Sequence, residues 1–145
     1  MTRVLATIAL ATALAASAVA QPPAPQPVLP EAQAWSGPPA IPALQAAWMI
    51  GAEDRPGPYV LRVRLAAGGL IPPHTHPDER HVTVLSGTIH VGFGDTVDEG
   101  RLVAVPAGAI YVAPAGVAHY VWAREGAAEY QETGVGPTAT TLLPR

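Results

Sequence analysis

The chain has 145 residues, of which eight are basic and eleven acidic, so its formal net charge is −3 with neutral histidines. Every basic residue is an arginine and no basic run occurs, which argues against a nucleic-acid partner. The absence of lysine excludes Schiff-base chemistry, and the absence of cysteine excludes disulfides and thiolate metal ligands.

Residues 1–20 are typical of a secretory signal peptide. Arg3 precedes an apolar run over residues 4–16, and Ala18-Val19-Ala20 provides the small residues that signal peptidase recognises. The run is shorter than the roughly 20 apolar residues of a spanning helix, which favours cleavage over a membrane anchor. We therefore expect an exported protein, periplasmic or secreted, with no stable membrane insertion after cleavage of the signal.

Proline dominates the next segment, residues 21–42, which contains eight prolines. Proline fixes φ and removes a backbone donor, so this segment is predicted to be a semi-rigid, extended linker. The remaining residues, 43–145, have the length of one domain.

The elements predicted after the linker are β-strands. Tyr59–Leu65 alternates with a period of two, which predicts that Leu61, Val63 and Leu65 face inward. His81–Leu85 and Thr88–Phe93 flank a Ser-Gly pair, which is typical of a β-hairpin. Further strands are predicted at 102–105, 109–113, 119–123, 128–133 and 138–143. This series predicts an all-β fold, a small antiparallel β-barrel or jelly roll.

Four of the five histidines indicate a metal site. His74, His76 and His81 fall within eight residues, and His119 follows 38 positions after His81. Side chains two positions apart share one face of a strand, so His74 and His76 can bind one ion, with His119 closing the site. The expected cofactor is a divalent transition metal, and Fe, Mn, Zn, Ni and Cu all remain open.

Two separated motifs in this region resemble those of the cupin superfamily, in its small single-domain form. Gly68, the His74-Thr75-His76 triplet and Gly87 have the spacing of the first motif, and Gly108, Pro114, Gly116 and His119 have that of the second. The resemblance implies a cupin barrel whose metal is held by His74, His76 and His119. It also implies that two copies pair through sheet edges as a homodimer.

One position departs from the family pattern. Arg80 stands where cupins usually have a glutamate ligand, and arginine has no lone pair for a cation. Three hypotheses stay open: a three-histidine site with open positions, a four-ligand site completed by His81 or Glu79, and a metal-free pocket in which Arg80 holds an anion. Glu79, Arg80 and Gln131 are also candidates for the pocket wall.

The resemblance implies two classes of function. Cupins that keep the histidine ligands include dioxygenases, isomerases and lyases of small oxygenated molecules, whereas others only bind ligands, and the fold does not decide between these roles. The first hypothesis is a metal-dependent, dioxygenase-like oxidoreductase acting on a small organic molecule. The alternative is a non-catalytic module that binds a small molecule, an anion or a metal.

Overall fold

The computed structural model describes residues 27–144, so the predicted signal peptide and the first residues of the predicted linker lie outside the described residues. Among residues 27–144, no helix has the length and hydrophobicity needed to cross a membrane.

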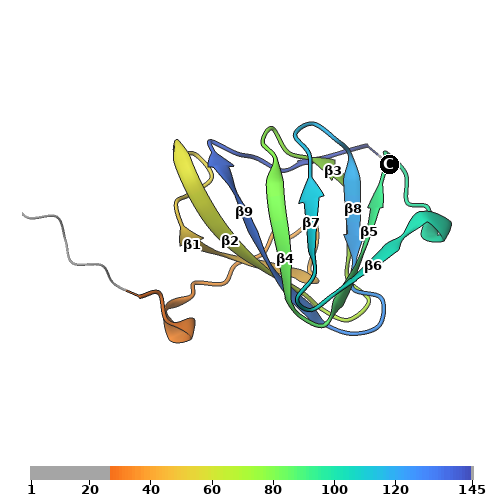
Figure 1. The fold of residues 1–145 in the computed structure, drawn as a ribbon, viewed down its shortest axis with the longest axis horizontal. Coiled ribbons are helices and arrows are strands. Elements are labelled where there is room, and N and C mark those ends of the chain that lie inside the picture. The colour runs from red at the N-terminus through yellow and green to blue at the C-terminus, as the bar shows by residue number, and fades with distance from the viewer. Residues whose placement is uncertain (1–26, 145) are drawn as a thin grey trace, which may run out of the picture.

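Two five-stranded antiparallel sheets form the domain (Figure 1). The first sheet has the strand order β1-β2-β9-β4-β7 and the second the order β10-β3-β8-β5-β6. The strands are β1 Leu44–Ile50, β2 Gly57–Leu65, β3 Leu70–Thr75, β4 Arg80–Ser86, β5 Thr88–Phe93, β6 Val103–Pro106, β7 Ile110–Ala113, β8 His119–Trp122, β9 Ala128–Gly136 and β10 Thr141–Leu142. Two short 3-10 helices span Pro30–Ala32 and Glu99–Arg101. The prediction of an all-β jelly roll is confirmed.

The hydrophobic core lies between the two sheets and draws on both. On β2 the predicted inward residues Leu61, Val63 and Leu65 are buried, whereas Arg64 is exposed on the outer face. The largest fully buried side chains include Tyr59, Tyr120, Tyr130, Ile89 and Val121. Burial of these apolar surfaces is the main stabilising contribution in a domain without disulfides.

The predicted hairpin between His81–Leu85 and Thr88–Phe93 is wrong. β4 pairs with β7 and β9 in the first sheet, whereas β5 pairs with β6 and β8 in the second. Gly87 joins them with a φ of 70°, which glycine adopts without steric cost, and the chain crosses there from one sheet to the other. A turn is present at Gly87, but the strands on its two sides pair within different sheets.

β3 is absent from the series of predicted strands, although His74 and His76 are expected to share one face of a strand; Pro72 and Pro73 interrupt its alternation, and it ends at Thr75, before His76. Its pairing with β8 shifts register between Ile71 and His74. Both of these residues are buried although they are three positions apart, an odd spacing that regular alternation would place on opposite faces. The irregularity therefore turns His74 into the interior, as β-bulges commonly do beside functional sites.

Residues at the end of the predicted linker pack against the first sheet. Ser36 forms an isolated bridge with Ala46, and the guanidinium of Arg64 lies 3.8 Å from the centroid of the Trp35 ring. Ile41 is buried and joins the core. Trp35, Ser36 and Ile41 thus contact the domain ahead of β1.

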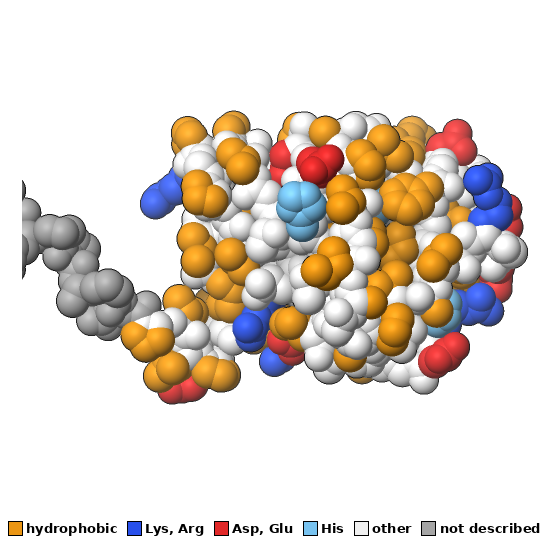
Figure 2. Space-filling model, in the orientation of Figure 1, with side chains coloured by type: hydrophobic (Ala, Val, Ile, Leu, Met, Phe, Trp, Pro, Cys, Tyr) orange, Lys and Arg blue, Asp and Glu red, His pale blue; other side chains and the backbone are white. Residues whose placement is uncertain are grey.

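Hydrophobic side chains gather over the face seen in Figure 2. Ile110 and Val112 on the edge strand β7 are 64% and 41% exposed, and Leu85 at the end of β4 is 41% exposed. Pairing of two copies through this sheet edge would cover such residues. The homodimer itself stays a prediction.

Gly92 on β5 provides a test of the packing. It lies opposite Tyr120 on β8, and a Cβ at Gly92 would overlap the Tyr120 ring. That ring is fully buried, and its hydroxyl donates to the Asp98 carbonyl at 3.0 Å and accepts from the Asp98 N–H at 2.9 Å. We expect Gly92→Ala to lower the free energy of unfolding by about 1–3 kcal/mol in urea titrations, the usual cost of overpacking.

Gly126→Ala is the matched control, because nothing lies within 4 Å of the Cβ position at Gly126. Equal stability of Gly92→Ala and Gly126→Ala would contradict the packing described for Tyr120.

Candidate metal centre

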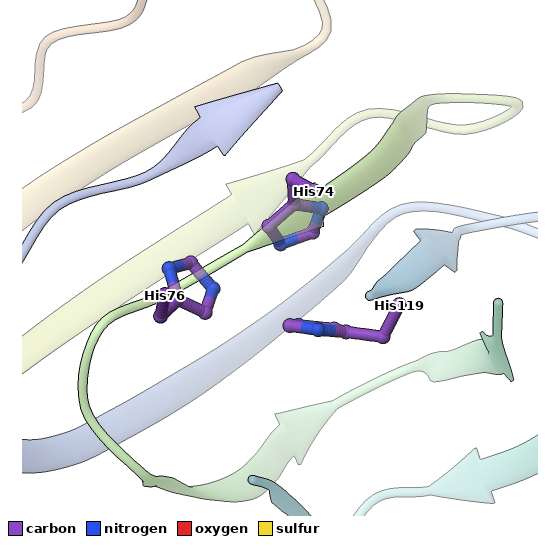
Figure 3. Close-up of side chains that lie close together, drawn as sticks. All are labelled: His74, His76 and His119. Atoms are coloured by element: carbon purple, nitrogen blue, oxygen red, sulfur yellow. The ribbon is translucent and has the colours of Figure 1, made fainter. Parts of the chain in front are cut away.

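Three buried imidazoles converge between the sheets (Figure 3). His74 lies on β3, His76 follows the end of that strand, and His119 begins β8 directly opposite His74 in the register. Their exposed fractions are 4%, 3% and 2%. One ligand atom from each residue lies within 4.8 Å of the others, and the ring centroids are 4.2 to 5.2 Å apart.

Backbone carbonyls set the orientation and the tautomer of each ring. The Nδ1 atom of His74 lies 2.8 Å from the Pro72 carbonyl, that of His76 lies 2.9 Å from Ala139, and that of His119 lies 3.1 Å from Val117. A carbonyl can only accept, so each Nδ1 must carry the hydrogen and each Nε2 keeps its lone pair. This is the tautomer in which metal-binding histidines are usually held.

Burial also keeps the rings neutral. Desolvation lowers the pKa of His74 to about 4 and that of His76 to about 3, with His119 and Arg80 respectively adding a smaller effect. Desolvation likewise lowers the pKa of His119. The Nε2 atom of His76 is buried and has no hydrogen-bond partner among the described residues. Neutral nitrogen donors with fixed tautomers and an orphaned lone pair fit a divalent transition metal.

His81 and Glu79 lie outside this cluster, which corrects the hypothesis of a fourth ligand from either residue. Their side chains are 60% and 54% exposed, and His81 Nε2 contacts Glu79 Oε1 at 3.1 Å. Successive side chains of a strand alternate, so the burial of Arg80 on β4 turns His81 outward. Gln131 is turned away from the interior in the same manner, and its Oε1 accepts from Arg62 Nε at 3.4 Å.

Arg80 lies at the centre of a buried polar network beside the histidines. Its Nη1 donates to Glu132 Oε2 at 2.6 Å, and its Nη2 donates to Thr138 Oγ1 at 2.8 Å and to the Ala139 carbonyl at 3.2 Å. The Ala139 carbonyl is also the acceptor for His76. Arg80 therefore helps to position His76 through a shared backbone oxygen.

Carboxylates balance the buried guanidinium. Glu132 on β9 is 7% exposed, and its pKa is raised by desolvation and held down in part by Arg80. Asp78 lies 3.8 Å from Arg80 Nε and accepts from the hydroxyls of Tyr59, at 2.6 Å, and Thr138. None of these partners was predicted. Glu132 had a signal in the sequence, since it is in phase with Ala128 and Tyr130 on the inward face of its strand.

A cavity of about 240 Å³ joins the two groups of residues. His74, His76, Arg80 and Glu132 line it together with the polar side chains of Glu53, Thr138 and Thr140, and the apolar wall includes Ile41, Leu61, Val63 and Ile71. A larger apolar groove of about 610 Å³ runs along residues 40–43, 68–70 and 95–97 and contains none of the histidines. The smaller cavity is the one whose wall combines apolar side chains with several polar groups.

Comparison with known proteins assigns the family. Residues 61–130, which include all three histidines, match the family model of the cupin domain. This chain belongs to the cupin superfamily. Its cupin fold is shared with the polyketide cyclase RemF from Streptomyces resistomycificus, with a TM-score of 0.69 at 16% identity over 83% of this chain and 86% of that one.

Other cupins match over shorter segments. Germin-like protein 5-1 of Oryza sativa subsp. japonica is 42% identical over 65 residues, which is 44% of this chain and 29% of the relative. Germin-like protein 3-1 of the same organism is 37% identical over 57% of this chain and 37% of its own length. The chain thus spans little more than a third of these relatives at most. An oxalate oxidase structure matches with a TM-score of 0.52 at 28% identity, over 61% of this chain and 47% of that one.

Removal of two imidazoles tests the metal centre. We expect His74→Ala combined with His76→Ala to reduce bound metal to less than about a tenth of the wild-type stoichiometry, because a single imidazole would remain. Inductively coupled plasma mass spectrometry of untagged protein, purified after incubation with the metal, measures this.

His81→Ala is the matched control for that variant, and it should keep the wild-type metal content because its side chain is exposed. Metal loss in His81→Ala, or full metal content in the double variant, would contradict the assignment.

The Arg80–Glu132 pair makes a separate prediction about stability. Removing one member of a buried ion pair leaves an uncompensated charge, so Arg80→Leu should cost about 3–5 kcal/mol in urea unfolding. Adding Glu132→Leu should recover most of that loss. If the double variant were no more stable than Arg80→Leu, the cost would not come from the orphaned carboxylate.

Proposed function

We propose that this cupin binds a divalent transition metal at His74, His76 and His119 and oxidises a small organic molecule in the adjoining cavity, with dioxygen as the oxidant. One observation carries the proposal: three neutral imidazoles, each with its tautomer fixed, converge beside a cavity that two of them, His74 and His76, line. Three protein donors leave coordination positions open for exogenous ligands.

A redox-active ion with open positions supplies the ability to activate dioxygen or to polarise a bound oxygen atom. The protein provides the arrangement around it. The backbone carbonyls hold the three rings, and the side chains of Ile41, Leu61, Val63 and Ile71 line the cavity and limit the size of the molecule that enters. The polar wall at Arg80 and Glu132 gives that molecule a preferred orientation.

The names of related structures support an oxidative role. The oxalate oxidase is 28% identical to this chain, and a salicylate 1,2-dioxygenase from Pseudoaminobacter salicylatoxidans shares the fold, with a TM-score of 0.60 at 16% identity over 72% of this chain and 30% of that one. Export belongs to the same proposal and is supported by the signal-like pattern of residues 1–20.

Oxygen consumption tests this function. The protein is loaded separately with Fe, Mn, Cu, Ni and Zn and then screened with small phenols, diketones and carboxylic acids in an oxygen-electrode assay. We expect uptake with at least one redox-active metal and none with zinc. His119→Ala should lower the rate at least a hundredfold, whereas His81→Ala should leave it unchanged. Stoichiometric metal binding without oxygen uptake for any metal would contradict the proposal and would favour a binding module.

A further inference from the structure

We infer that Arg80 is the specificity determinant of the cavity and that the ligand it selects is a small carboxylate. This inference rests on the proposed function, because it concerns the same cavity in its metal-loaded form. It extends that function by naming the class of ligand and the side chain that recognises it.

The first observation is an unused donor. Arg80 is 4% exposed, and while its two Nη atoms donate to Glu132, Thr138 and Ala139, its Nε has no hydrogen-bond partner among the described residues. Asp78 Oδ1 lies 3.8 Å from this Nε, too far for a hydrogen bond. A buried donor without an acceptor is costly, and a donor on a charged group costs more.

The second observation is that the Arg80 side chain lines the cavity. Arg80 lines the same cavity as His74 and His76, so one small molecule can contact both the guanidinium and the metal position. A carboxylate is the acceptor that suits this arrangement, because one of its oxygens can accept from the unused Nε and its negative charge strengthens that hydrogen bond, while the other oxygen is left for the metal position.

Charge favours the same class of ligand. The charged side chains that line the cavity are Arg80, Glu132 and Glu53. A divalent ion at the three histidines would add two positive charges beside them, so an anion should enter the metal-loaded cavity more favourably than the metal-free one.

The size and lining of the cavity restrict which carboxylates can bind. The volume of about 240 Å³ is below the roughly 300–1,000 Å³ of typical ligand pockets, and Ile41, Leu61, Val63 and Ile71 make part of the wall apolar. The ligand expected is a monocarboxylate with a short apolar body.

Isothermal titration calorimetry on the zinc-loaded protein tests the preference for a carboxylate without relying on turnover. The titrants are acetate, butyrate and benzoate, each paired with its neutral amide of nearly the same shape. For the wild type we expect at least one carboxylate to bind ten or more times tighter than its amide.

Two variants distinguish the contribution of Arg80 to carboxylate binding from that of the metal. Glu132→Gln frees the guanidinium and raises the cavity charge by one, so carboxylate binding should tighten about tenfold. Arg80→Gln combined with Glu132→Gln keeps the formal charge and replaces the charged guanidinium donors by neutral amide groups, so carboxylate binding should weaken about tenfold while amide binding stays the same. Arg64→Gln, on the exposed outer face, is the control and should match the wild type.

Arg80→Lys provides a second route if the double variant does not fold. It keeps the charge but loses the Nε donor, and carboxylate binding should weaken at least threefold. A carboxylate-to-amide ratio that is unchanged in these Arg80 variants, with zinc binding intact, would overturn this inference alone, because the preference would then belong to the metal. Failure of the wild type to bind zinc would overturn the metal centre and this inference together.

Discussion

The hydrogen bonds from three imidazole Nδ1 atoms to backbone carbonyls are the interaction on which the site depends. Two of the carbonyls, Pro72 and Val117, lie two residues before the histidines they hold, so β3 carries the His74 ring with its support, and the turn that leads into β8 supports His119. The third carbonyl, Ala139, lies 63 positions beyond His76 and is brought close by the pairing of β10 with β3. The C-terminal strand is therefore part of the site, although it contributes no ligand.

Arg80 connects the two sheets at the same place. It lies on β4 of the first sheet and donates to Thr138 and Ala139, which precede β10 of the second. The Ala139 carbonyl accepts from both Arg80 and His76. A change in the Arg80–Glu132 pair would therefore alter the hydrogen bond that orients His76, a proposed metal ligand. The residue that departs from the family pattern thus has a structural role in addition to the role in recognition that we propose for it.

The sequence predicted the fold class and the three central histidines, because alternation and motif spacing are local signals. It did not predict β3, whose two prolines hide a strand, nor the register shift that turns His74 inward. The crossing at Gly87 was also missed, since a glycine turn looks the same whether the next strand pairs with its neighbour or joins the other sheet. Glu132 was not predicted as a site residue, because its partner Arg80 lies 52 positions away and only tertiary packing brings the two together.

The most direct test of this account is a crystal structure of the metal-loaded protein with anomalous scattering measured at the absorption edge of the metal. The account predicts one anomalous peak, about 2.0–2.2 Å from the Nε2 atoms of His74, His76 and His119, with the remaining coordination positions held by solvent or a small ligand. Arg80 should remain paired with Glu132. A peak bonded to Glu132, Glu79 or His81, a ring that binds through Nδ1, or the absence of a peak in saturated crystals would contradict it.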